Sequence, residues 1–208
     1  MPHNYGVNIQ KVLDSASAEH VTHGKSWYRL ARLEALKISE ETNVSFLVAC
    51  GVIAALSPRN KWARNLQDAR NMCGPWALHM KYATFTRNVN KAHEIKQMGK
   101  TRAQISEILG GDKTRAFFDN IYDANSSMVT IDLHMQMVAL GGYLAEKHRP
   151  HITKKHYKEI AGAVIALANK YGLRPHELQA ITWLAWRDSR ANRKLPANGK
   201  KERRNASA

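Results

Sequence analysis

The chain has 208 residues, of which 44% are hydrophobic and five are tryptophan, so it is long and apolar enough for a packed core, which excludes a disordered protein. Lys and Arg outnumber Asp and Glu by 32 to 17, and the formal net charge of +15 favours nucleic acid as partner over a membrane surface or a merely basic domain. The two cysteines, Cys50 and Cys73, form no C-x-x-C pair, which argues against a disulfide framework and against a zinc or iron–sulfur site.

No cofactor and no metal are therefore expected. No apolar run approaches the ~18 residues of a membrane span, and the first ten residues lack the apolar centre of a signal peptide. We expect a monomeric, cytoplasmic protein that does not enter a membrane.

The first half of the chain predicts two helices after an N-terminal extension. Residues 1–25 are assigned to this extension and give only a weak helical signal at Ile9–Leu13. Apolar residues at helical spacing then predict an amphipathic helix that is capped at Ser26 and ends near Thr42. The segment Asn43–Leu56 is apolar almost all round, which indicates a buried central helix, with a buried strand as the alternative.

Ser57-Pro58 ends this helix, because proline cannot extend the helical hydrogen bonds and disfavours the α conformation of the residue before it. Arg59, Asn60 and Lys61 follow in a polar loop, where Arg59 either contacts a ligand or pairs with a surface carboxylate. A polar-faced helix over residues 63–73 comes next, and residues 76–90 are predicted to be irregular and to line a groove.

Three capping signals follow along the chain. Asn88 or Asn90 is predicted to cap a helix through Met98, and Thr101 with Gln104 forms a capping box that opens the next helix. That helix ends at Gly110-Gly111, and another begins at once, which predicts two helices joined by a very tight turn.

This glycine hairpin has the composition of an anion site. Glycine lets the backbone approach another molecule closely, and the start of a helix presents free amides. Lys113, Thr114 and Arg115 follow the glycines directly and add two cations and a hydroxyl. Backbone amides and side chains together therefore suit a phosphate. The residues predicted to contact it are Gly110, Gly111, Lys113, Thr114 and Arg115.

Asp132 is a lone acid in the apolar run 129–135. It either performs chemistry or caps the following helix, which is predicted to run to about Ala145. His134 is predicted to support Asp132 through a cap, packing or a phosphate contact.

The C-terminal part predicts two further helices. Thr153 caps a long one through Ala168 that is ended by Gly172, and Pro175 opens the last. In that last helix Trp183 and Trp186 are interpreted as core residues, because they lie at helical spacing among aliphatic residues. Beyond Arg190, residues 191–208 are predicted to be a basic, disordered tail.

Every predicted element is helical, so the fold class is all-α. Three features in their order resemble the helix-hairpin-helix superfamily of DNA glycosylases: Leu56-Ser57-Pro58-Arg59, the hairpin from Leu109 to Ala116, and Ile131-Asp132-Leu133-His134. With Gly110 as the first hairpin glycine, the family's small helix residue falls at Ala116 and its catalytic aspartate at Asp132 without a gap. Asp112 replaces the second glycine, and Arg59 stands where the family has glutamine.

The resemblance covers roughly residues 26–190 and implies a two-lobed fold with the catalytic aspartate in the cleft between the lobes. It implies a monofunctional DNA N-glycosylase that binds duplex DNA, because Thr114 stands where bifunctional members carry a Schiff-base lysine. Asp132 would stabilise the sugar cation or activate water, while Arg59, with Asn60 and Lys61 beside it, would fill the space of the flipped base.

Two alternatives remain open. The same fold occurs in bacteriophage transferases that remodel hypermodified thymines, and small proteins of this kind occur in bacteriophage genomes, which would place the protein in a bacterial host cell. The second alternative is a non-catalytic DNA-binding protein that has kept the hairpin. The sequence identifies no base, because the predicted pocket-lining loops contain no recognisable pattern.

Overall fold

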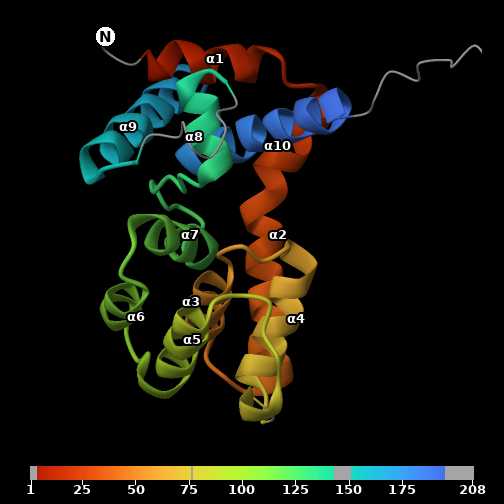
Figure 1. The fold of residues 1–208 in the computed structure, drawn as a ribbon, viewed down its shortest axis with the longest axis vertical. Coiled ribbons are helices and arrows are strands. Elements are labelled where there is room, and N and C mark those ends of the chain that lie inside the picture. The colour runs from red at the N-terminus through yellow and green to blue at the C-terminus, as the bar shows by residue number, and fades with distance from the viewer. Residues whose placement is uncertain (1–3, 76, 143–150, 195–208) are drawn as a thin grey trace, which may run out of the picture.

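The computed structural model describes residues 4–75, 77–142 and 151–194, and every regular element in these ranges is helical, which confirms the all-α prediction (Figure 1). The helices are α1 (Tyr5–Asp14), α2 (Ala18–Thr42), α3 (Phe46–Leu56), α4 (Trp62–Cys73), the 3-10 helix η1 (Ala77–His79), α5 (Thr86–Met98), α6 (Arg102–Leu109), α7 (Asp112–Tyr122), α8 (Leu133–Leu140), α9 (Lys154–Lys170) and α10 (Pro175–Lys194).

The described residues form two hydrophobic cores. The middle core is built mainly by α2 to α7, and the terminal core by α1, α8, α9 and α10. Figure 1 shows the terminal helices gathered at one end of the molecule and the middle helices at the other. Both ends of the chain therefore contribute to one core.

Helix α2 joins the two cores. Its 25 residues extend over ~37 Å, and it packs extensively on α10 as well as on α3 and α4. Gly24 permits the contact with α10, because a Cβ at this position would lie 2.7 Å from the Ile181 Cα. A side chain there would push the two helices apart.

The start of α2 differs from the prediction. Ser17, not Ser26, caps the helix, and its hydroxyl accepts a hydrogen bond from the His20 amide while the Ser17 amide donates to His20 Nδ1. Ser26 lies inside the helix and donates to the Thr22 carbonyl. The histidine at the third helical position takes the part usually played by Glu or Gln in a capping box, which is why the sequence pattern did not reveal it.

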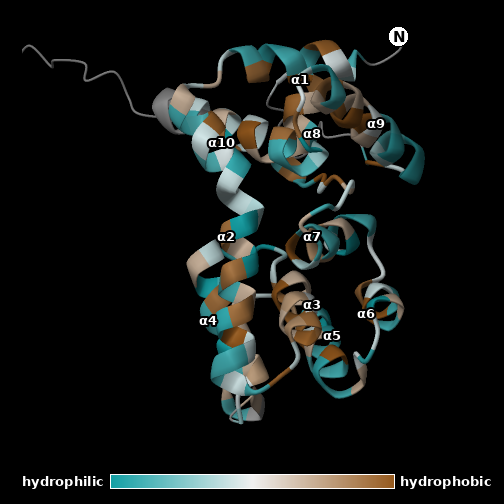
Figure 2. Cartoon of the chain, turned by 180° about the vertical axis from the view of Figure 1, so that it is seen from behind, coloured by the Kyte–Doolittle hydropathy of each residue, from teal (hydrophilic) through white to brown (hydrophobic). Residues whose placement is uncertain are grey.

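Helix α3 is the buried central helix that its composition predicts. Ser45 caps it, and every residue from Val48 to Leu56 is buried. Figure 2 shows α3 mostly in the brown of hydrophobic residues. The strand alternative is wrong here, since the segment packs against helices on several sides.

The middle of the chain brings one further correction. Helix α5 begins at Thr86, within the segment predicted to be irregular, and neither Asn88 nor Asn90 caps it. Asn88 is instead buried, and its amide donates to Thr84 Oγ1 at 2.9 Å. The capping box of Thr101 and Gln104 is confirmed at the start of α6.

The C-terminal helices have different ends from those predicted. Helix α8 stops at Leu140, because Gly141 adopts a left-handed conformation, and the rest of the predicted helix to Ala145 falls partly outside the described residues. Thr153 caps α9, as predicted, but α9 continues to Lys170. Helix α10 continues to Lys194, and the predicted tail from residue 195 onward lies outside the described residues.

No single helix of the described residues has both the length and the apolar composition to cross a membrane. Helices α2 and α3, bent by 115° relative to each other, meet that test only when taken together.

Candidate nucleic-acid interface and catalytic carboxylate

Asp132 lies at the N-terminus of α8 with both carboxylate oxygens engaged. Its Oδ1 accepts a hydrogen bond of 2.9 Å from the Met135 amide, so Asp132 is the N-cap of the helix. Its Oδ2 accepts one of 2.9 Å from the indole nitrogen of Trp183 on α10. The side chain is half-buried, and the two donors fix its orientation while each oxygen keeps further acceptor capacity.

The segment before Asp132 is held by a tyrosine from α9. The Ile131 amide donates to the Tyr157 hydroxyl at 3.2 Å, and that hydroxyl donates to the Val129 carbonyl at 2.7 Å. Burial, together with the negative charges of Asp112 and Asp132, raises the pKa of Tyr157 to about 12, although the hydrogen bond with the Ile131 amide lowers it. Asp112 opens α7 at the glycine hairpin, so the hairpin and Asp132 both lie within electrostatic range of one phenol.

A buried polar network lies where the two cores meet. The Tyr28 hydroxyl on α2 lies 3.1 Å from Thr130 Oγ1 and 2.9 Å from Gln179 Oε1, and the Asn120 amide donates to the same threonine at 3.3 Å. Burial raises the pKa of Tyr28, and the charge of Asp132 raises it as well. This network fixes the chain just before Asp132 to both α2 and α10.

Four aromatic rings form a cluster that reaches Asp132 through Trp183. The Trp27 ring centroid lies 5.2 Å from that of Trp62, 5.9 Å from that of Phe117 and 6.4 Å from that of Trp183. The three tryptophans are half-buried, and together with Phe117 we call them the aromatic cluster. Trp186 is buried as predicted, but Trp183 is not simply a core residue, because its indole binds Asp132.

An apolar groove of about 630 Å³ adjoins the aromatic cluster. Helices α2, α4 and α10 form its walls, and Trp27 and Trp62 belong to both the groove and the cluster. Asp132 does not line it. This groove therefore meets the candidate site through two tryptophan rings and not through the carboxylate.

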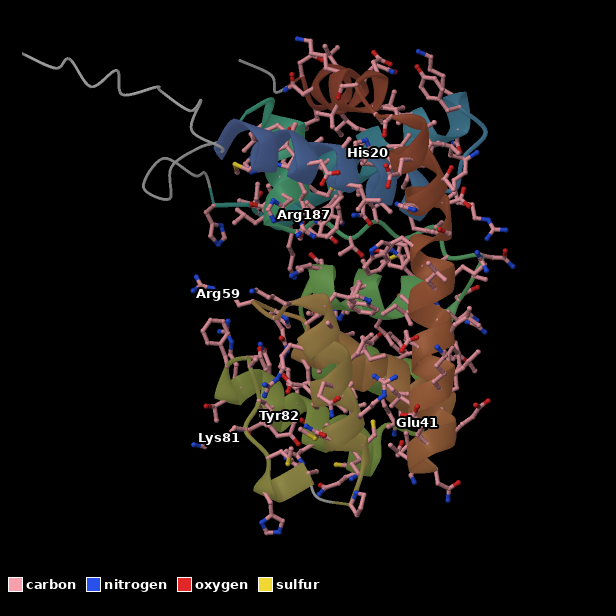
Figure 3. All side chains as sticks on the ribbon, turned by 90° about the vertical axis from the view of Figure 1, so that its right-hand side faces the viewer. His20, Glu41, Arg59, Lys81, Tyr82 and Arg187 are labelled. Atoms are coloured by element: carbon pink, nitrogen blue, oxygen red, sulfur yellow. The ribbon has the colours of Figure 1, made fainter. Side chains whose placement is uncertain are left out.

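Arg59 lies on the loop between α3 and α4 and is exposed. Its φ of 58° is left-handed, an uncommon conformation for a residue with a side chain. The guanidinium carbon lies 5.5 Å from the centre of the Phe85 ring. Figure 3 shows Arg59 directed away from the body of the protein at the level where the two cores meet, with Arg187 of α10 above it.

Buried Asp68 holds the Arg59 loop in place. Its carboxylate accepts hydrogen bonds from Asn60 Nδ2 at 2.9 Å, from Arg64 Nε at 2.8 Å and from the Ala83 amide at 2.9 Å. Asn60, predicted to contact DNA, thus has a positioning role, and Lys61 is exposed beside it. Asp68 went unrecognised in the sequence, because a single acid on a polar helix face carries no signal of burial.

The glycine hairpin has the geometry that its sequence predicts. Gly110 has a φ of 73°, which favours glycine, and α7 begins two residues later. The first helical hydrogen bond of α7 runs from the Arg115 amide to the Gly111 carbonyl. The amides of residues 112–114 precede it and have no carbonyl partner within the helix, as is usual in the first turn.

The side chains around the hairpin divide into two groups. Arg115 donates through Nε to the Ser106 carbonyl at 2.7 Å, and Thr114 donates to the Gly111 carbonyl at 3.0 Å, so both brace the turn. Lys91 of α5 donates to the Leu109 carbonyl at 2.7 Å. Lys113 makes no hydrogen bond or ion pair within the described part of the chain, and its ammonium is available to a ligand.

A model of a protein family of unknown function (DUF7178) matches residues 2–190. The chain belongs to this family. No curated protein and no solved structure matches the chain. The DUF7178 match includes α1 and the start of α2, residues that the sequence analysis assigned to an N-terminal extension and that pack on the terminal core.

His134 is the last of the site residues predicted from the sequence of this DUF7178 member. It is half-buried on α8, and its ring stands perpendicular to that of Trp183 with centroids 6.0 Å apart. Among the residues that the structure describes, no group of three or more His, Cys, Asp or Glu side chains is placed to bind a metal ion. Trp183 thus contacts both candidate residues, Asp132 through a hydrogen bond and His134 through its ring.

Proposed function

We propose that the protein binds duplex DNA and hydrolyses the N-glycosidic bond of a damaged or modified nucleoside, with Asp132 as the catalytic carboxylate. The observation that carries this proposal is the position of Asp132. A carboxylate oriented by the Met135 amide and the Trp183 indole lies next to a cluster of half-buried aromatic rings, on the segment that follows a glycine hairpin.

This arrangement suits the chemistry of base release. As the glycosidic bond breaks, positive charge develops on the sugar, and a fixed anion near C1′ stabilises it more than water would. The same carboxylate is able to accept a proton from an attacking water. Both roles require an oriented acceptor, which the two hydrogen bonds of Asp132 supply.

The surroundings of Asp132 match the needs of base flipping. A base reaches an enzyme only after it leaves the duplex, and aromatic faces such as those of Trp27 and Trp62 are suited to stack against it. Arg59, which is exposed on a loop fixed by Asp68, would occupy the vacated space. The amides of the hairpin and Lys113 would hold the phosphate backbone.

Non-catalytic DNA binding is the second candidate, and one observation favours it. The Met135 and Trp183 hydrogen bonds are also what a purely structural helix cap would make, fixing α8 to α10. In that case the hairpin and the net charge would provide all of the function.

The deciding experiment incubates the protein with duplex DNAs that carry different damaged or modified bases and analyses base and DNA by mass spectrometry. A free base in solution supports the glycosylase. An increase in the mass of a base that stays in the DNA would instead support a transferase. DNA that is bound but chemically unchanged across the panel would contradict both enzymes and leave the binding protein.

A further inference from the structure

A basic recess of about 270 Å³ lies between α2, the end of α7 and the start of α10. Lys25, Arg29 and Arg32 line it from one face of α2, since they are four and three residues apart. At about 100° per residue, Trp27 lies ~200° round the helix from both Lys25 and Arg29. The recess therefore opens on the side of α2 away from the aromatic cluster.

Two arginines of the recess are held by carbonyl groups at the end of α7 and just after it. Arg32 donates through one terminal nitrogen to the carbonyls of Ile121 and Tyr122, and Arg174 donates in the same way to the Ala124 carbonyl at 2.7 Å. Because a guanidinium has five N–H groups, each arginine keeps donors outside these bonds. Their positions are fixed before any ligand arrives.

The other two cations of the recess have no partner in the described part of the chain. Lys25 and Arg29 are exposed and make no hydrogen bond or ion pair there. Glu177 supplies the single carboxylate among the described residues of the lining, and its Oε2 accepts a hydrogen bond of 2.9 Å from the Arg174 amide at the start of α10. Four cations thus face one acid, and an anion in the recess would relieve their repulsion.

The lining also contains buried polar groups in fixed orientations. Asn120 donates to Thr130 Oγ1, and the Nδ1 of His176 lies 3.0 Å from the Ser126 carbonyl, which can only accept, so this nitrogen carries a proton. Such groups distinguish the recess from a patch of surface lysines, because their positions are set by the network that joins the two cores.

We infer that this recess binds a phosphate group, carried either by a DNA backbone or by a free nucleotide. Its volume lies just below the ~300–1,000 Å³ of typical small-molecule sites, which fits one phosphate and part of its carrier and not a larger ligand. The fixed guanidinium groups match the planar recognition of phosphate oxygens. This inference does not depend on the chemistry of Asp132.

The test compares two double variants that each remove two positive charges from exposed helix positions four residues apart. Lys25→Ala/Arg29→Ala changes the recess, and Lys154→Ala/Lys158→Ala on α9 is the matched control. Inorganic phosphate, a deoxynucleoside monophosphate and a duplex DNA are titrated into each protein, with amide and side-chain NMR shifts of Asn120 and Arg174 as the local readout. Circular dichroism melting confirms that each variant is folded.

We expect phosphate to shift the Asn120 and Arg174 signals of the unchanged protein. Its affinity should fall at least about tenfold in the recess variant but not in the control. A DNA affinity whose salt slope falls by about two in the recess variant alone identifies a backbone phosphate as the natural ligand. A loss of nucleotide binding with unchanged DNA binding identifies a free nucleotide. Equal behaviour of the two double variants towards all three ligands would overturn the inference.

Discussion

Replacement of Asp132 by asparagine separates catalysis from capping, and the structure sets its expected cost. The carbonyl oxygen of the new side chain would still accept from the Met135 amide, because Asn caps a helix about as well as Asp. The NH₂ group of that side chain would face the Trp183 indole N–H, so two donors would meet and one hydrogen bond to a carboxylate would be lost.

A hydrogen bond to a charged group contributes about 1.5–3 kcal/mol. Trp183 is half-buried, and water replaces part of the lost bond, so we expect Asp132→Asn to reduce the free energy of unfolding by about 1–2 kcal/mol. For a chain of this size that corresponds to roughly 2–8 °C in Tm. Base release should fall about 100-fold or more, while DNA affinity stays equal or increases because a negative charge has been removed.

Trp183→Phe is the matched comparison, since it removes the same hydrogen bond from the other side and keeps both an aromatic ring and the carboxylate. It should lose a similar amount of stability and less activity than Asp132→Asn. Unfolding is measured with denaturant, DNA binding by fluorescence anisotropy, and base release by mass spectrometry. Full activity in Asp132→Asn, or equal losses of activity in the two variants, would refute a catalytic role for the carboxylate.

Four further variants test the remaining features. Gly110→Ala should destabilise the fold by about 1 kcal/mol in denaturant unfolding, because Gly110, unlike Gly111, has a left-handed φ. Gly111→Val should leave stability unchanged and should weaken DNA binding, because its side chain would hold the phosphate away from the amides. Arg59→Ala should lose activity on paired targets and keep most of it on single strands; equal losses would indicate a plain phosphate contact. Burial lowers the pKa of His176, so the neutral ring stabilises the fold fully above its unfolded pKa of about 6.5 and this contribution is lost as pH falls through the folded pKa. His176→Asn should reduce that loss of stability in denaturant melts below about pH 6.5, and identical pH profiles would contradict it.

The sequence predicted a structural element well where residues close together in the chain determine it. The apolar run of α3, the Thr101–Gln104 capping box and the double glycine each determine structure within a few residues, and each element forms where the sequence placed it. The start of α2 was missed, because a histidine replaced the usual capping acid. Helix ends such as that of α8 depend on whether one glycine turns left-handed, which the sequence leaves open.

The candidate site was predictable only in part, because its contacts join residues far apart in the chain. Asp132 was identifiable as a lone acid in an apolar run. Its bond to Trp183, 51 residues later, depends on how α8 meets α10, and the burial of Asp68 depends on the loop at Ala83 closing over it. No periodicity or spacing in the sequence encodes such contacts between residues far apart in the chain.

The two cores meet through elements that resist relative movement, and this bears on how the site would work. Helix α2 runs unbroken from its contact with α10 into the middle core. Gly24 lets it lie directly against the backbone of α10, and Tyr28 bonds to Thr130 and Gln179. A hinge would need a break or a loosely packed contact, and the contacts of α2 with α10 and Thr130 provide neither within the described part of the chain. These contacts hold the Asp132 carboxylate and the aromatic cluster in a fixed relation to each other. If the protein acts on a flipped base, as we propose, such a junction would not select bases by closing around them. Discrimination would then come from the ease with which a particular base leaves the duplex and from the shape of the aromatic cluster.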